Sequence, residues 1–94
     1  MEKGPGEYEV LVHRKVDKFL SNIDEKNRAR VLELLSDLRT YPQVLRHYDA
    51  AKLKGVEYAF RIRVGAFRII FQVDKHKRRI IVTRIDFRER VYEA

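Results

Sequence analysis

The clearest potential for chemistry in this 94-residue sequence lies in three arginines, Arg61, Arg63 and Arg68. They lie on either side of Gly65-Ala66, and a glycine at the first central position suits a two-residue type II′ hairpin turn. In that register Arg63 faces Arg68, and Arg61 shares their side of the ribbon. A guanidinium group is planar and permanently charged, so a convergent arginine face is suited to bidentate contact with phosphates.

Folding alone gives no evident reason to place Arg63 opposite Arg68. Like charges directly opposite each other destabilise a sheet by roughly 0.2–1 kcal/mol per pair. The alternative is a solvated face on which the arginines extend into water. Arg84 joins this face if the preceding loop is Lys75 to Lys77, and it turns toward the helices if that loop is one residue longer. The sequence leaves this register open.

The hydrophobic pattern predicts the elements that position these arginines. Alternation predicts an N-terminal strand over Glu7–His13, and helical spacing then predicts two antiparallel helices. The first begins at Arg14. The second is capped by Asp24 and ends at Thr40-Tyr41-Pro42, because the residue before a proline leaves the helical region. The two apolar stripes consist of Val16, Phe19, Leu20 and Ile23, and of Val31, Leu34, Leu35 and Leu38.

The second half of the chain has the pattern of a sheet. Residues 43–56 are expected to form an irregular connection, broken by Gly55 just ahead of a three-strand meander. The three strands are expected over Glu57–Val64, Phe67–Asp74 and Arg79–Asp86. The predicted fold is a single α+β domain over residues 1–94. Its antiparallel sheet consists of the N-terminal strand and the meander, and the helical hairpin packs on one face.

The charge distribution indicates an anionic partner. Lys and Arg total 21 against 14 Asp and Glu, which gives a net charge of +7 and a pI near 9.9. Residues 1–50 carry nine basic and nine acidic side chains, whereas residues 51–94 carry twelve and five, so the whole excess lies in the second half. A well-solvated, charge-rich surface is the alternative explanation.

Composition excludes several other classes of function. Cysteine is absent, which excludes disulfides, thiolate metal sites and a cysteine nucleophile. Metal-ligand spacings, phosphate-binding glycine loops and Ser/His/Asp sets are also missing, so no metal and no cofactor is expected. No apolar run approaches the roughly 20 residues of a membrane span, and a signal-peptide pattern is lacking. A cytoplasmic location without membrane contact is therefore expected. The isolated histidines, expected at the surface or in packing, are His13, His47 and His76.

Three segments carry a resemblance to a known family: YAFRIRVGAFRIIF at 58–71, KLKG at 52–55 and RERVY at 88–92. Through them the sequence resembles the RelE branch of the RelE/ParE toxin superfamily. The resemblance runs over nearly the full chain, and the overall pattern is most similar to the archaeal members. It implies a toxin of a toxin–antitoxin pair that enters the ribosomal A site and cuts messenger RNA there. The implied reaction is attack of a ribose 2′-hydroxyl on the adjacent phosphodiester, which leaves a cyclic phosphate and a free 5′-hydroxyl.

The resemblance implies catalytic roles for five residues. Arg61 and Arg63 fall where the family has two basic residues, the first of which is thought to help remove the 2′-hydroxyl proton. Arg68 matches the arginine that holds the scissile phosphate. Arg88 matches the tail arginine that supports charge and the leaving group, and Tyr92 matches the tyrosine that stacks on or orients the base.

Two departures from the bacterial pattern bear on these roles. Three residues separate Arg88 from Tyr92, fewer than in bacterial members, so Arg90 competes for the role of tail arginine. Arg61 is protonated at any working pH and is a poor proton acceptor, so no general base is identified. Preorganised guanidinium groups would instead stabilise the charge on the pentacoordinate phosphate. Further RNA contacts are expected from Lys52, Lys54, Arg84 and Arg90.

The resemblance also implies partners, namely the ribosome with its A-site messenger RNA and a RelB-like antitoxin in a heterodimer or heterotetramer. Helices and extended segments of the antitoxin would wrap the domain and cover its apolar grooves. Leu45, Tyr48 and Tyr58 are candidate exposed anchors for it or, equally, members of the core. Two alternatives stay open: a ParE-type toxin that inhibits gyrase without needing the arginine cluster, and a non-catalytic basic RNA-binding module of the same fold.

Overall fold

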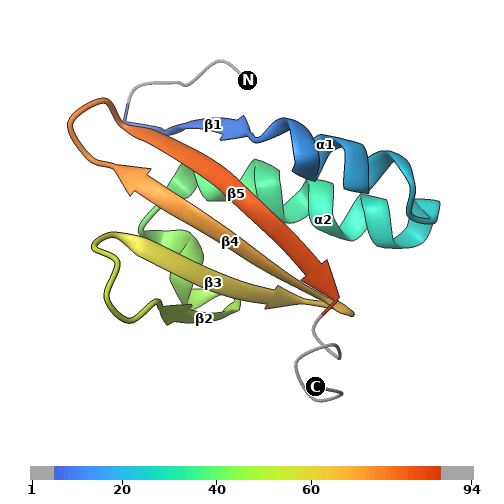
Figure 1. The fold of residues 1–94 in the computed structure, drawn as a ribbon. Coiled ribbons are helices and arrows are strands. Elements are labelled where there is room, and N and C mark those ends of the chain that lie inside the picture. Colours follow the sequence, from blue (N-terminus) through green and yellow to red (C-terminus); the bar gives the residue numbers. More distant parts are fainter. Residues whose placement is uncertain (1–5, 88–94) are drawn as a thin grey trace.

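The computed structural model describes residues 6–87, which form two helices and five strands (Figure 1). The helices are α1 (Arg14–Ser21) and α2 (Glu25–Asp37), and 3₁₀ turns follow at Leu38–Thr40 and Gln43–Arg46. The strands are β1 (Glu9–Val12), β2 (Asp49–Lys52), β3 (Ala59–Val64), β4 (Phe67–Asp74) and β5 (Arg79–Phe87). The α+β class and the meander of β3, β4 and β5 are confirmed. Neither of the two helices in the described part is long and apolar enough to cross a membrane.

The five strands form one sheet in the order β1-β5-β4-β3-β2. Neighbouring strands are antiparallel except at one edge, where β1 pairs in parallel with β5 from Glu9 opposite Arg79 to Val12 opposite Val82. The prediction of a wholly antiparallel sheet is therefore wrong for the N-terminal strand. A tight turn makes neighbouring strands antiparallel, whereas β1 leads into the helical hairpin and has no such turn to its neighbour.

Side-chain caps determine where both helices begin. His13 is the N-cap of α1, and its Nδ1 accepts a hydrogen bond from the Lys15 N–H at 3.0 Å, so the first strand ends at Val12 and not at His13. Asp24 caps α2 as predicted. Its carboxylate accepts hydrogen bonds from the Asn27 N–H at 3.3 Å and from the Asn27 side chain at 2.7 Å. The side-chain hydrogen bond lowers the pKa of the Asp24 carboxyl.

The helices pack on one face of the sheet and leave the other face open (Figure 1). The apolar stripe predicted for α2 is buried, and so are Val16 and Leu20 of α1. Beneath them the sheet contributes alternate residues, because successive side chains of a strand point to opposite faces. The buried sheet residues include Ile62, Phe67, Ile69, Phe71, Val73, Ile80, Val82 and Ile85. The same alternation turns the intervening side chains to the open face.

The strand β2 lies in residues 43–56, where the sequence pattern predicts an irregular connection, so that prediction is wrong. Its four residues, Asp-Ala-Ala-Lys, include no β-branched or aromatic side chain and have little intrinsic preference for a strand. The strand forms because β3 offers a free edge, along which Asp49 to Lys52 pair antiparallel with Arg63 to Phe60. Long-range pairing, and not local propensity, decides this element.

The strand β3 begins at Ala59, later than the predicted start at Glu57. Tyr58 has a φ of +56°, a left-handed conformation that does not continue a strand. Its carbonyl still accepts a hydrogen bond from the Val73 N–H at 2.8 Å, and the Lys75 ammonium lies 4.7 Å from the centre of its ring. The loop before β3 is therefore tied to the end of β4.

Because two adjacent isoleucines lie on different faces of β5, their truncation is expected to reduce stability by different amounts. Ile80 is fully buried under the helices, whereas Ile81 is 36% exposed on the open face. We expect Ile80→Ala to lower the free energy of unfolding by about 2–5 kcal/mol, because it removes buried apolar volume, and Ile81→Ala to lower it by less than about 1 kcal/mol. Urea unfolding followed by circular dichroism measures both. Equal losses would contradict the assigned facing of β5.

Candidate functional site

The hairpin of β3 and β4 has the register that its sequence predicts. Gly65 and Ala66 connect the strands, and of these two only Gly65 has a positive φ, at +55°, which is typical of a type II′ turn. Arg63 pairs directly with Arg68. The expected juxtaposition of like charges is therefore present.

Arg84 also lies on the open side of the sheet, although the loop before β5 predicts otherwise. That loop has four residues, and a four-residue loop is expected to turn Arg84 toward the helices. A β-bulge reverses this expectation, because Thr83 is an extra residue in β5 and Arg84 pairs with Ile70. The Thr83 hydroxyl donates a hydrogen bond to the Ile70 carbonyl at 3.4 Å. The conditional prediction from loop length is therefore wrong, and the bulge places Arg84 beside the other arginines.

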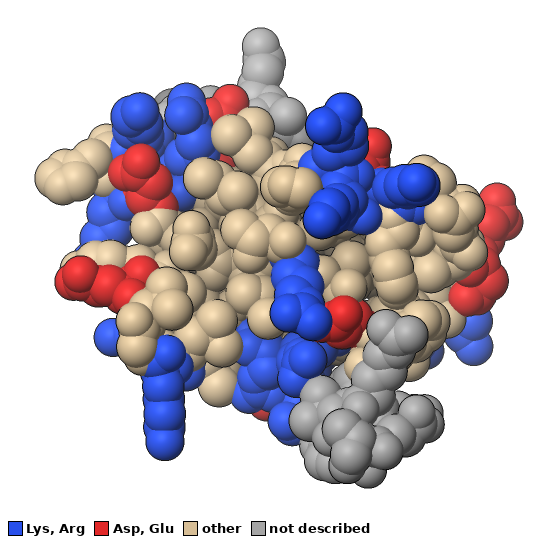
Figure 2. All heavy atoms as spheres, viewed as in Figure 1, with Lys and Arg blue, Asp and Glu red and all other residues tan. Residues whose placement is uncertain are grey.

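We call these four residues, Arg61, Arg63, Arg68 and Arg84, the arginine face; they lie on the sheet side opposite the helices. Figure 2 views this side, where basic side chains cross the centre and lower part next to acidic ones. In the order given, the side chains are 16%, 34%, 25% and 65% exposed. Arg61 and Arg68 are thus held close to the sheet, whereas Arg84 projects into solvent.

Two aspartates complete a row of charges across four strands. Asp49 of β2 pairs with Arg63, Arg63 with Arg68, and Arg68 with Asp86 of β5. Neighbouring strands lie about 4.8 Å apart, so this charge row spans about 14 Å in the order negative, positive, positive, negative. The flanking carboxylates offset the repulsion between the central arginines. Folding therefore accommodates the arginine pair, contrary to the expectation from the hairpin alone.

Asp49 holds its arginines loosely. Its Oδ1 lies 4.0 Å from Arg61 Nη2, and its Oδ2 lies 3.6 Å from Arg63 Nη1. Its side chain is 58% exposed. These are solvent-screened ion pairs at distances longer than a hydrogen bond.

Asp86 holds its arginines more tightly. Its Oδ2 lies 2.6 Å from Arg84 Nε and 3.5 Å from Arg68 Nη2, and its side chain is only 16% exposed. The Arg84 contact is a close ion pair, and Arg68 Nη2 donates a hydrogen bond to the same Asp86 oxygen. With two carboxylates among four guanidinium groups, the arginine face keeps a net charge of +2.

Two buried guanidinium nitrogens on this face, Arg61 Nη1 and Arg68 Nε, have no hydrogen-bond partner among residues 6–87. Buried polar groups in folded proteins are nearly always hydrogen-bonded, and a buried donor left unpaired costs roughly 1–3 kcal/mol. One orphaned donor lies near Asp49 and the other near Asp86. Both nitrogens are inaccessible to solvent, so a ligand approaching the arginine face meets the other guanidinium nitrogens first.

Lys52 and Lys54, which were predicted to contact RNA, are not brought to the arginine face. Lys52 pairs with Phe60 and is exposed at the sheet edge, on the side that the helices cover. Phe60 lies three residues before Arg63 along β3, a separation of about 10 Å. Lys54 follows in the loop after β2. Their contact with RNA therefore stays a prediction. Any RNA that they bind would lie away from the arginine face.

The tail residues Arg88, Arg90 and Tyr92 lie outside the described residues, so their roles remain predictions. Among residues 6–87 no group of three or more His, Cys, Asp or Glu side chains is arranged to hold a metal ion. All three histidines are exposed, and His13 is also the cap of α1 already described.

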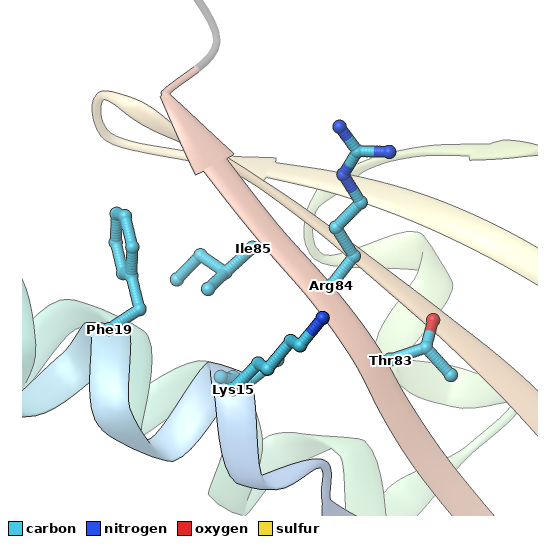
Figure 3. Close-up of a pocket in the computed structure, with 6 residues that line it drawn as sticks. Lys15, Phe19, Thr83, Arg84 and Ile85 are labelled. Carbon is cyan, nitrogen blue, oxygen red and sulfur yellow. The ribbon is translucent and has the colours of Figure 1, made fainter.

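A pocket of about 350 Å³ lies between α1 and β5, beside the arginine face (Figure 3). Ile85 points toward Phe19 of α1, whereas Arg84 extends away from α1 on the other side of the strand. β1 pairs with β5 only as far as Val82, so beyond it this edge of β5 has no paired strand among the described residues. The pocket is lined by Lys15, Val16, Phe19, Thr83, Arg84 and Ile85.

The three candidate anchors for a partner differ in exposure. Leu45 and Tyr48 are half-buried against the core. The Tyr48 hydroxyl donates a hydrogen bond to Asp37 Oδ2 at 2.7 Å, and burial together with this bond raises the pKa of the Tyr48 hydroxyl. Tyr58 is 38% exposed, and it is the most exposed of the three.

A helical hairpin on one face of such a sheet is the fold of RelE toxins of known structure. A chain of the archaeal RelE–RelB complex from Pyrococcus horikoshii OT3 has a TM-score of 0.78 and 28% identity, covering 88% of this chain and 97% of that chain. A chain of the Methanococcus jannaschii RelB–RelE complex has a TM-score of 0.69 and 25% identity over 88% and 95%. The isolated E. coli RelE toxin shares the fold at 19% identity, with a TM-score of 0.71 over 92% of each chain.

Sequence comparison assigns the family. A curated protein of Methanocaldococcus jannaschii named "Putative toxin RelE1" is 33% identical over 86 residues, which make up 92% of this chain and 96% of that protein. The chain therefore belongs to the RelE toxin family. No protein-family model matches the sequence.

The charge row predicts a salt-dependent loss of stability when both carboxylates are neutralised. The double variant Asp49→Asn/Asp86→Asn leaves Arg63 and Arg68 adjacent without counter-ions. We expect it to lower the free energy of unfolding by about 1 kcal/mol at low salt, and the loss to shrink in about 1 M NaCl, which screens the repulsion. Urea unfolding at both salt concentrations measures the difference. A loss of equal size at both would attribute it to something other than charge repulsion.

Proposed function

We propose that this protein is the toxin of a type II toxin–antitoxin system and acts in the cytoplasm as a ribosome-dependent endoribonuclease. It would cleave messenger RNA in the A site and so inhibit translation. Membership of the RelE family supports the toxin assignment. The observation that carries the nucleolytic assignment is the arginine face, because four guanidinium groups on one open surface suit the phosphates of RNA.

In the proposed reaction a ribose 2′-oxygen attacks the adjacent phosphorus and gives its proton to solvent, and the bond to the 5′-oxygen breaks. The departing 5′-oxygen takes up a proton from solvent, so no proton is gained or lost overall. The products are a 2′,3′-cyclic phosphate and a 5′-hydroxyl end. Negative charge accumulates on the phosphate oxygens of the pentacoordinate transition state. Arg68 is the candidate for holding the scissile phosphate, since it occupies the middle of the face between Arg63 and Asp86 and its side chain is partly exposed.

The contribution of the arginine face is electrostatic. Guanidinium groups are protonated at any working pH, so they stabilise developing charge and do not remove the proton. One preorganised donor aimed at such charge contributes on the order of 10²–10³ in rate. Alignment of the 2′-oxygen with the leaving 5′-oxygen would then come from the ribosome. We therefore expect little cleavage of free RNA.

Arg68→Ala tests the proposed role. We expect it to lower the rate of messenger RNA cleavage by about 10²–10³-fold and to relieve growth arrest on expression, while circular dichroism shows an intact fold. Arg79→Ala is the matched control, because Arg79 lies on the same open sheet side but at the far end of β5, with its Nε 2.9 Å from Glu9 Oε1. It is expected to keep near-wild-type activity. Mapping messenger RNA 5′ ends in a translation extract measures both.

The same experiment distinguishes the alternatives. Undiminished toxicity of Arg68→Ala would count decisively against the proposed mechanism. DNA-damage signalling with intact messenger RNA would favour a gyrase inhibitor of the ParE type. Binding that weakens steeply with salt, without cleavage products, would indicate a non-catalytic RNA-binding module.

The proposed partner is a RelB-like antitoxin in a heterodimer or heterotetramer, and the similarity to chains of two archaeal RelE–RelB complexes supports it. We place part of the antitoxin at the pocket between α1 and β5. The apolar side chains of Val16, Phe19 and Ile85 offer a floor for apolar anchors, and the unpaired edge of β5 offers backbone groups for strand addition. An occupant there would also cover Arg84 and so one side of the arginine face.

Charge reversal at the pocket rim tests this placement. Lys15→Glu alters the rim, whereas Lys77→Glu makes the same charge change on the loop between β4 and β5. We expect Lys15→Glu to weaken antitoxin binding several-fold, mainly through slower association, because a protein with net charge +7 favours an acidic partner. Lys77→Glu is expected to change it little. Surface plasmon resonance with a RelB-like antitoxin measures both, and equal effects would place the antitoxin elsewhere.

A further inference from the structure

The asymmetry between the two aspartates of the charge row points to a role for Asp49. We propose that Asp49 occupies, in the free protein, the place of an RNA phosphate, and that an incoming phosphate displaces it from Arg61 and Arg63. The arginine face would then hold two phosphate subsites. One lies at Arg68, and the second lies at Arg61 and Arg63, where Asp49 sits in the absence of RNA. This inference rests on the proposed function and extends it to how the face selects its ligand.

The contacts of Asp49 are those of a displaceable counter-ion. Its oxygens lie 3.6 Å and 4.0 Å from guanidinium nitrogens, beyond the roughly 2.7–3.2 Å of an N–H···O hydrogen bond. More than half of its side chain is exposed, at 58%. It is also the first residue of β2, which pairs with β3 alone among the strands of residues 6–87. Little in this setting opposes movement of the carboxylate out of the subsite.

Asp86 has the opposite character. Its Oδ2 lies 2.6 Å from Arg84 Nε, and only 16% of its side chain is exposed. It stands directly opposite Arg68 on the neighbouring strand. Asp86 is therefore a fixed counter-ion that orients Arg84 and Arg68, and the phosphate subsite at Arg68 forms beside it.

A phosphodiester is a better occupant of the second subsite than the carboxylate. Arg61 and Arg63 are two residues apart on one strand, so their side chains leave the same face about 6.7 Å apart and both reach Asp49. A phosphate there carries one negative charge, as the carboxylate does, and has additional oxygens. These oxygens can accept hydrogen bonds from both guanidinium groups, whereas the Asp49 carboxylate lies beyond hydrogen-bond distance of either.

The arrangement discriminates between RNA and small anions. A single small anion has to displace Asp49 with its own binding energy alone. An RNA strand that already has one phosphate at Arg68 presents the next phosphates at high local concentration, so the displacement becomes an intramolecular step. Asp49 thus selects for a ligand with several linked phosphates.

Two isosteric variants with the same charge change test the inference. Asp49→Asn and Asp86→Asn each remove one negative charge from the charge row. With a short fluorescein-labelled single-stranded RNA, we expect Asp49→Asn to lower Kd by up to about fivefold and to steepen the salt dependence of binding by up to about 0.7 in log–log slope. We expect Asp86→Asn to leave the affinity unchanged or to weaken it. Fluorescence anisotropy over a range of salt concentrations measures both.

Two further readouts separate competition from a merely structural effect. The apparent KM for A-site cleavage in a translation extract is expected to fall for Asp49→Asn with kcat unchanged. Asp49→Glu restores a carboxylate on a longer arm and is expected to return Kd and KM toward the wild-type values. Inorganic phosphate is expected to bind the Asp49→Asn variant more tightly than it binds the wild-type protein.

The outcomes distinguish failure of this inference from failure of the proposed function. If both asparagine variants tighten RNA binding equally, each carboxylate affects binding only through its negative charge. That result would overturn the inference. Wild-type cleavage with unchanged Kd and KM for Asp49→Asn would also overturn it, while the proposed function would stand. A wild-type protein that neither binds RNA nor cleaves messenger RNA on the ribosome would overturn both.

Discussion

The charge row from Asp49 through Arg63 and Arg68 to Asp86 is the interaction on which the open face of this protein depends. Two arginines directly opposite each other repel, and a carboxylate from each flanking strand offsets that repulsion. The row holds the guanidinium groups near the sheet without neutralising the face, because two anions lie among four cations. The arginines can therefore lie side by side without a bound ligand, and the face keeps a positive charge that attracts an anionic ligand.

Stability and chemistry lie on opposite faces of the same strands. The helix-covered face carries the fully buried residues, such as Ile69, Phe71 and Ile80. The open face carries the arginines and aspartates. Solved structures with 19% and 28% identity to this chain share the fold, and a shared fold does not by itself determine function. A functional assignment therefore has to be argued from the open face.

Local signals in the sequence were sufficient for most of the fold and for the centre of the site. The cap at Asp24, the stripe of α2 and the glycine turn between β3 and β4 each depend on residues close together in the chain, and all three are confirmed. The facing of Arg63 and Arg68 follows from that turn by alternation alone. The failures concern pairing at long range, namely β2, the parallel direction of β1 and the bulge at Thr83.

The sequence by itself determined the class of fold, the two helices, the hairpin register and three of the four arginines on one face, because helical and strand periods and a glycine turn act over a few residues. Only the tertiary structure decided that Arg84 joins them and that Asp49 and Asp86 flank them. Strand partners and bulges are chosen by the edges that packing leaves free, and residues far apart in the chain meet only there.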